Sequence, residues 1–76
     1  MKDLVEFLAR ELVDEPDSVN VTETTDDRGS VLTLRVAPDD MGKVIGRGGR
    51  TAKAIRAVVR AAATRTGTLV RLDIAD

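Results

Sequence analysis

The spacing of apolar residues divides the chain into helical and extended segments. In the first segment leucine recurs every four positions, which places one apolar stripe along a helix. Asp3 is placed to cap this helix, and Pro16 stops it, because the residue before a proline disfavours helical backbone angles. The pattern therefore predicts a helix from Asp3 to about Asp14. Its apolar stripe consists of Leu4, Leu8 and Leu12, with Val5 and Ala9.

Alternation of apolar and polar residues replaces the helical spacing in the next two segments. From Ser18 to Thr25 valines alternate with polar residues, which is typical of a strand. Residues 25–30 are rich in turn-forming types. From Val31 to Ala37 the alternation resumes with two fairly apolar faces, which favours a central strand. The two segments predict an antiparallel hairpin.

Helical spacing returns after Pro38, where the second strand is expected to end. Asp39 or Asp40 can cap a short helix that runs to Ile45. The chain closes with a third alternating segment, from Thr68 to Ala75, which predicts another strand.

A longer helix is predicted from Arg50 to Thr66, with Gly67 as its C-terminal cap. At about 100° per residue, one face of this helix is expected to face the core. That face holds Thr51, Ala54, Ile55, Val58, Val59 and Ala62. The basic residues gather on the other side, at Arg50, Lys53, Arg56 and Arg60. Arg56 and Arg60 taken alone are more typical of a solvated helix face than of a site.

The order of elements, α-β-β-α-α-β, predicts an α+β fold. The third strand follows a two-helix crossover, so it is expected to return parallel to the second strand. This gives a three-stranded mixed sheet with three helices packed on one face. The 76 residues are few enough for a single domain spanning residues 1–76.

The amino-acid composition lacks most residue types used in catalysis and metal binding. The chain has no cysteine, histidine, tryptophan or tyrosine, and Phe7 is its only aromatic residue. The usual general base, the commonest metal ligand and thiolate chemistry are therefore missing, so we expect no enzyme, no cofactor and no metal. No apolar run approaches the ~20 residues of a membrane span, and the N-terminus lacks a signal-peptide pattern. A cytoplasmic protein without membrane contact is expected.

Charge is divided unevenly along the chain. Residues 1–40 contain four basic and eleven acidic residues, whereas residues 41–76 contain eight basic and two acidic ones. No acid occurs from Met41 to Leu72. Matching of charges to helix dipoles explains only a few of these positions. The second half is therefore predicted to carry an anion-binding face.

The glycine-rich turn Gly46-Arg47-Gly48-Gly49 is the natural place for that anion. Glycine lets a backbone approach closely, and the free N–H groups of the following helix suit a phosphate. Basic side chains surround the turn, and nearby apolar side chains are expected to form a floor for unstacked bases. The predicted nucleic-acid contacts are Lys43, Val44, Ile45, Gly46, Arg47, Gly48, Gly49, Arg50, Lys53 and Ile55.

The segment from Val44 to Ile55 resembles the signature of the KH domain. That family clamps about four nucleotides of single-stranded RNA over its GXXG loop. An α-β extension (1–25) ahead of a β-α-GXXG-α-β core (30–76) resembles the type II arrangement. The whole chain resembles the stand-alone bacterial KhpA proteins, also called the YlqC group.

This resemblance implies a probable RNA chaperone that forms homodimers. It also implies pairing with a larger KH-containing protein, KhpB or Jag, and a role in cell-wall homeostasis and cell shape. Gly48 departs from an ordinary loop, because it leaves Arg47 as the loop's only side chain. More ordering entropy should therefore be lost on binding.

Two other functions were weighed. A KH-fold interaction module that mainly docks a protein partner stays open, and the surface of Ala57, Ala61 and Ala63 could admit a partner helix. A helix-turn-helix DNA binder is disfavoured, because residues 40–45 are too short for a supporting helix. The Rossmann and Walker phosphate motifs do not fit the glycine spacing. Asp26 and Asp27 are more typical of a solvated turn than of a metal site.

Overall fold

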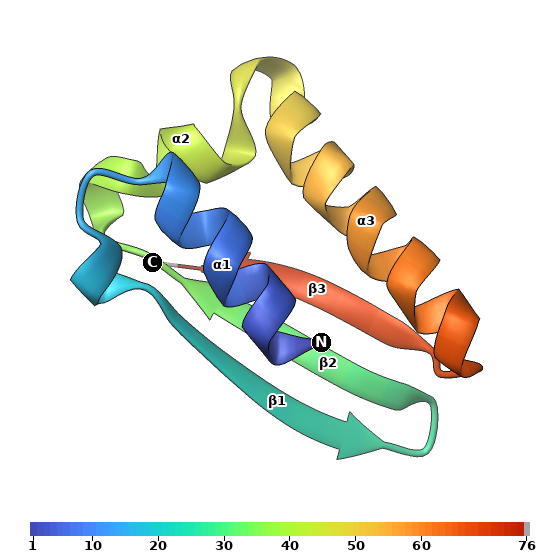
Figure 1. Cartoon of the computed structure of the whole chain (residues 1–76). Helices are drawn as coiled ribbons and strands as arrows, with labels where there is room; N and C mark the ends of the chain where they lie inside the picture. The colour runs from blue at the N-terminus through green and yellow to red at the C-terminus, as the bar shows by residue number, and fades with distance from the viewer. Residues whose placement is uncertain (76) are drawn as a thin grey trace.

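The computed structural model describes residues 1–75 and has the predicted order of elements, so the α+β expectation is confirmed (Figure 1). Short 3-10 turns join several of the helices and strands. The helices and strands are α1 (Lys2–Leu12), β1 (Asn20–Asp26), β2 (Gly29–Arg35), α2 (Met41–Ile45), α3 (Arg50–Thr66) and β3 (Val70–Ala75). None of the helices in the described residues is long and apolar enough to cross a membrane.

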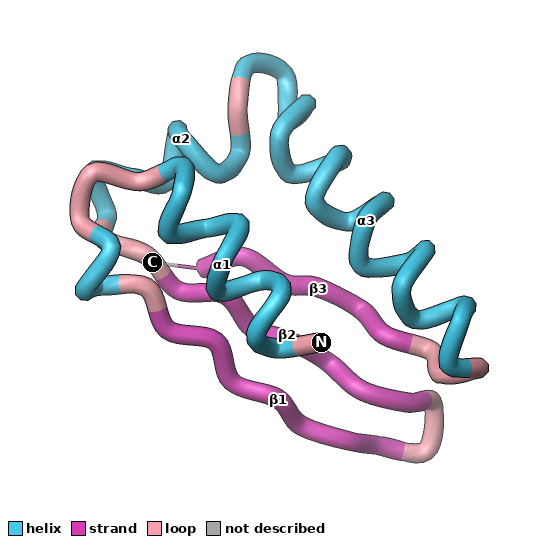
Figure 2. Tube along the Cα trace, viewed as in Figure 1, coloured by secondary structure: helices cyan, strands magenta, loops and turns pink. Residues whose placement is uncertain are grey.

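The sheet is mixed, in the order β1-β2-β3 (Figure 2). Strands β1 and β2 pair antiparallel, from Asn20 opposite Arg35 to Asp26 opposite Gly29. Strand β3 lies parallel to β2, with Leu72 opposite Leu32. The central position of β2 and the parallel return of β3 are therefore as predicted.

One face of the sheet and the helices enclose the core. Leu32 and Leu34 of β2 are fully buried, whereas Val31, Thr33 and Arg35 alternate with them and belong to the opposite face. All three helices contribute buried side chains to the same cluster. The cluster contains Val5, Ala9, Val19, Val21, Leu32, Leu34, Val36, Val44, Ile55, Val59 and Leu72.

The first helix differs from its prediction at both ends. It begins at Lys2 after Met1 and ends at Leu12, so Asp3 lies inside the first turn and is not the cap. A carboxylate in the first turn still suits the helix dipole. Pro16 opens a 3-10 turn, and residues 13–15 are left as a connection.

The bounds of α3 and its Gly67 cap are confirmed, with Gly67 in the left-handed conformation at φ 71°. The predicted buried face is wrong in part, because Ala54 and Val58 are exposed. Alanine occupies both sides of this helix, so hydropathy does not fix which arc meets the sheet. The arc that does so carries Ala52, Ile55, Val59 and Ala63. Ala63 is therefore buried and is not part of the surface suggested for a partner helix.

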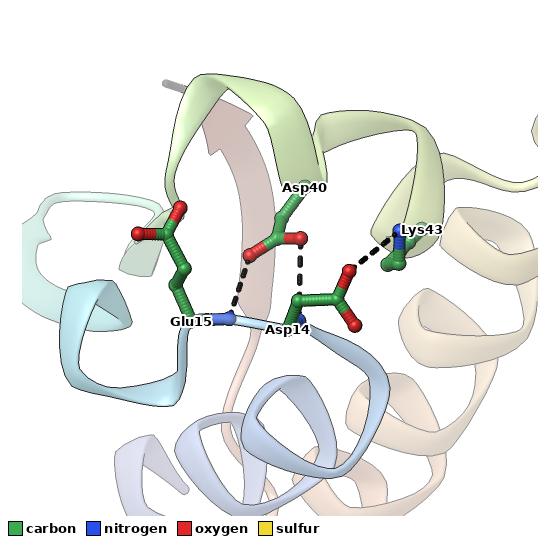
Figure 3. A network of polar contacts seen from close by, with 4 residues as sticks. All are labelled: Asp14, Glu15, Asp40 and Lys43. Carbon is green, nitrogen blue, oxygen red and sulfur yellow. Dashed lines mark hydrogen bonds and ion pairs between the residues drawn. The ribbon is translucent and has the colours of Figure 1, made fainter.

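Asp40 precedes α2, but its side chain does not cap that helix (Figure 3). Its carboxylate accepts hydrogen bonds from the backbone N–H groups of Asp14, at 3.2 Å, and Glu15, at 3.0 Å. Only 2% of the residue is exposed. Asp40 therefore occupies the predicted N-cap position, but its carboxylate bonds the connection after α1 and not the first turn of α2. Asp40 thereby fastens residues 14–15 to the start of α2.

Candidate nucleic-acid interface

The glycine turn between α2 and α3 requires glycine for two different reasons. Gly46, Gly48 and Gly49 all have positive φ, at 77°, 65° and 78°, a region that other L-residues seldom occupy. A Cβ at Gly46 would also run into Thr51, whereas a Cβ at Gly48 or Gly49 would meet nothing within 4 Å. Gly46 therefore packs against α3, while the outer two glycines border open space.

The open space lies at the N-terminus of α3. The helix begins after Gly49, and no side chain in the described part of the chain caps its first turn. The first N–H groups of a helix lack partners within the helix and carry its positive dipole end. Arg47 and Arg50 are exposed on either side of Gly48 and Gly49. The N–H groups of Gly49 and Arg50 donate to the carbonyls of Gly46 and Arg47 in the preceding 3-10 turn. The positive dipole end, the arginine charges and the free space therefore coincide, which suits a phosphate.

Lys43, predicted to contact the anion from α2, already has a partner (Figure 3). Its ammonium group lies 3.2 Å from a carboxylate oxygen of Asp14, and both side chains are well exposed. An acid just after α1 thus neutralises part of the basic charge near the loop. Lys53 lies exposed on α3, one turn beyond the loop.

The apolar floor expected from the sequence needs correction. Val44 is fully buried and Ile55 is 5% exposed, so both belong to the core beneath the loop. Ile45 is the one of the three that presents substantial surface, with 37% exposed. Val44 and Ile55 therefore support the loop from below, and direct apolar contact with a ligand falls to Ile45.

A groove of about 380 Å³ lies between α3 and β3, which was not predicted from the sequence. Arg56 and Arg60, four residues apart on α3, were its one sequence signal. Strand β3 completes the groove. Its parallel pairing with β2 is what places it beside these two arginines. Leu69, just before β3, is 62% exposed at its rim. The lining consists of Arg56, Val59, Arg60, Leu69, Val70, Arg71 and Leu72.

Two of the groove's arginines are held by specific contacts. Arg56 donates from Nε to the backbone carbonyl of Leu72, at 3.2 Å. Arg71 points its guanidinium to Asp26 at the end of β1, with 2.8 Å between Nη2 and the carboxylate oxygen. Arg56 is therefore held against β3, while the charge of Arg71 is paired with Asp26 of the hairpin.

The groove and the loop are neighbours along α3. Arg56 follows Arg50 by six residues, which is about 9 Å along a helix axis. An α-β-β-α-α-β domain with a glycine loop between its last two helices is a KH domain.

Comparison with known proteins identifies the family. The family model described as "KhpA/KhpB, KH domain" matches residues 2–74, so the chain belongs to this family. The chain is 59% identical over 76 residues to the RNA-binding protein KhpA of Halalkalibacterium halodurans, covering 100% of both chains. It is 53% identical to RNA-binding protein KhpA of Clostridium acetobutylicum, over 97% of this chain and 99% of that one. Identity to RNA-binding protein KhpA of Streptomyces coelicolor is 49%, over 100% and 92%.

Proposed function

We propose that this chain binds single-stranded RNA by holding a phosphate on the loop from Gly46 to Gly49. The observation that carries the proposal is the open space over Gly48 and Gly49 at the uncapped start of α3. Relatives that cover the whole chain are named RNA-binding proteins, which supports the choice of ligand. The role is one of binding, without catalysis.

The other predicted RNA contacts fall into two groups, those that touch the phosphate and those that lie farther from it. Arg47 and Arg50 add charge-assisted hydrogen bonds to the phosphate oxygens. Lys43 and Lys53 act as more distant positive charges, and Ile45 contacts a base or sugar. The groove between α3 and β3 receives the next bases. Apolar contact replaces aromatic stacking there, since the only aromatic residue, Phe7, lies on α1.

The same proposal extends to partners. We infer a homodimer, and a heterodimer with a larger KH-containing protein of the KhpB or Jag type. The family's description covers both KhpA and KhpB, which supports such a pairing. Two linked modules would raise the weak affinity of one by effective concentration. A cytoplasmic RNA chaperone that contributes to cell-wall homeostasis and cell shape is the role this implies.

A second candidate is an interaction module that mainly docks a protein. The exposed side of α3 favours it, because Val58 is 45% exposed beside the exposed Ala54, Ala57 and Ala61. Small side chains permit close approach of another helix. On this reading, RNA contact is weak and pairing with the partner survives changes in the glycine loop.

Two substitutions at Gly48 test RNA binding. Aspartate and asparagine tolerate the left-handed conformation better than most residues, and a Cβ here meets nothing within 4 Å. Gly48→Asp places a negative charge at the phosphate, whereas Gly48→Asn adds nearly the same volume without charge. We expect Gly48→Asp to lose at least about tenfold more affinity than Gly48→Asn, corresponding to roughly 1.4 kcal/mol.

The measurement is fluorescence anisotropy with a labelled single-stranded RNA, with thermal melting as the control for folding. Equal affinities for the two variants would mean that no phosphate lies on the loop. Retained pairing with a protein partner in Gly48→Asp, together with unchanged RNA affinity, would favour the interaction module.

A further inference from the structure

We infer that the free edge of β1 accepts one added strand from a protein partner, an extended peptide segment that carries basic side chains. Strand β1 forms one margin of the sheet, and β3 forms the other (Figure 1). The surface is therefore separate from the glycine loop and the groove, and the inference does not depend on RNA binding. It rests on the backbone groups that β1 leaves unpaired and on the charge around them.

Alternate residues of β1 direct their backbone polar groups away from the sheet. Ser30 of β2 donates its N–H group to Leu69 on the β3 side. Because neighbouring residues of a strand point these groups in opposite directions, the odd-numbered residues of β2 face β1 and pair with its even-numbered residues. The N–H and C=O groups of Val21, Glu23 and Thr25 therefore point to the free edge.

This edge lacks the common features that block pairing. Proline, lysine, bulges and covering segments usually protect an edge strand. Strand β1 contains neither proline nor lysine, and its register with β2 runs without a break from Asn20 to Asp26. Six of its seven residues are exposed, and in the described part of the chain no further strand lies beyond it. Four of the seven are β-branched, which suits an extended pairing.

The charge around β1 decides which strand fits. From Glu11 to Asp27 the chain has seven acidic residues and no basic one. Glu23 lies at the middle of the free edge and takes part in none of the ion pairs of the described residues. A second copy paired about this point would set Glu23 opposite the same residue of that copy, and like charges directly opposite destabilise a sheet. A basic residue opposite Glu23 is favourable, so the edge fits a basic strand.

Strand addition at β1 leaves the basic surface open. The main-chain hydrogen bonds of an added strand supply affinity, and the alternating side chains supply specificity. Because β2 separates β1 from β3, the added strand does not touch the groove. The negative charge beside β1 also repels a polyanion. A basic peptide and RNA can therefore be bound at the same time, on opposite margins of the sheet.

The probe is a seven-residue peptide of alternating lysine and threonine with blocked ends, and hydrogen exchange followed by NMR reports each amide of β1. In the free protein the amides of Val21, Glu23 and Thr25 should exchange at least about tenfold faster than those of Thr22 and Thr24, which bond to β2. The peptide should slow the three edge amides by at least about tenfold and leave the other two unchanged.

Two further peptides separate backbone pairing from charge. The lysine peptide with N-methylated backbone amides keeps its charge and loses its donors. An alternating glutamate and threonine peptide keeps the donors and reverses the charge. Both should bind at least about fivefold more weakly than the lysine peptide.

Two variants test the protein side of the contact. Thr25→Pro removes an outward N–H group without touching the ladder to β2, and Glu23→Lys reverses the charge at the middle of the edge. Each should weaken binding of the lysine peptide about fivefold or more. Glu11→Lys is the matched control, because it makes the same change of charge on α1. Thermal melting checks folding, and Glu23→Lys serves if Thr25→Pro does not fold.

The result that supports the inference is protection of the three edge amides by the lysine peptide and weaker binding in both variants. Absence of protection at the highest soluble peptide concentration would overturn it, and so would equal binding of the lysine and glutamate peptides. Protection that rises with protein concentration alone would assign the edge to a second copy of the chain. Protection by single-stranded RNA would assign it to nucleic acid, and either result would also overturn the inference.

Discussion

At the scale of single residues, Asp40 is the most deeply buried charged residue of the described part of the chain. Its carboxylate is 2% exposed and satisfies two backbone N–H groups that lie 25 and 26 residues away in the sequence. A buried carboxylate is stable only when hydrogen bonds replace its hydration. Here the backbone of residues 14–15 supplies them, so the position of the α1–β1 connection depends on one side chain.

Asp40→Ala should therefore destabilise the fold by at least about 2 kcal/mol, because two N–H groups lose their acceptor in a partly buried place. Asp39→Ala is the control, since this exposed neighbour lies in the same 3-10 turn. The control should change the free energy of unfolding by less than about 0.5 kcal/mol. Urea denaturation of both variants measures the difference. Equal losses in the two variants would contradict the fastening role of Asp40.

At the scale of elements, the order of helices and strands and their pairing in the sheet were predictable, whereas several bounds and the side-chain packing between elements were not. Pro16, Pro38 and the glycine turn mark the ends of segments locally, so the order of elements followed from the sequence. The arc of α3 that meets the sheet did not, because alanines occur on both sides of the helix. A local capping rule placed Asp40 correctly at the start of α2, but the partners of its carboxylate lie in distant backbone and could not be predicted.

Of the candidate site, the glycine loop was predictable from the sequence and the groove was not. The glycine turn and its basic neighbours are contiguous in sequence, and the loop was found from them alone. The groove brings Arg56 and Arg60 against residues 69–72, which requires the packing of β3 beside α3. Burial of Val44 is likewise a property of the folded core, since an apolar side chain near a loop can point to either side.

The ion pair between Lys43 and Asp14 joins α2 to the connection after α1. If RNA contacts Lys43 as we propose, this pair competes with it for the lysine. Asp14→Asn should free the ammonium group and raise RNA affinity about 1.4- to fivefold, matching the roughly 0.2–1 kcal/mol of an exposed pair. Binding titrations at constant salt measure the change.

Asp17→Asn is the matched control, because it removes the same charge from the same connection without breaking this pair. A comparable gain in the control would mean that overall charge, and not release of Lys43, governs the effect. No gain in Asp14→Asn would mean that Lys43 does not contact the RNA.

At the scale of the whole molecule, the two halves of the sequence divide the charge between them. The acidic residues 1–40 form α1 and the hairpin, whereas the acid-free stretch from Met41 to Leu72 forms the loop, α3 and the start of β3. The positive charge is therefore concentrated beside the glycine loop and the groove, although the net charge of the chain is −1. Such an arrangement attracts a polyanion to one region and repels it from the rest.

The salt dependence of RNA affinity tests the central claim, a phosphate held at the glycine loop, most directly. Each phosphate neutralised on a single strand adds about −0.7 to the slope of log K against log salt concentration. We predict a negative slope for wild type and a slope smaller in magnitude by about 0.7 for Arg47→Gln. Arg65→Gln, near the far end of α3 and away from the loop, should keep the wild-type slope. An affinity independent of salt, or the same slope in wild type and Arg47→Gln, would contradict the phosphate clamp.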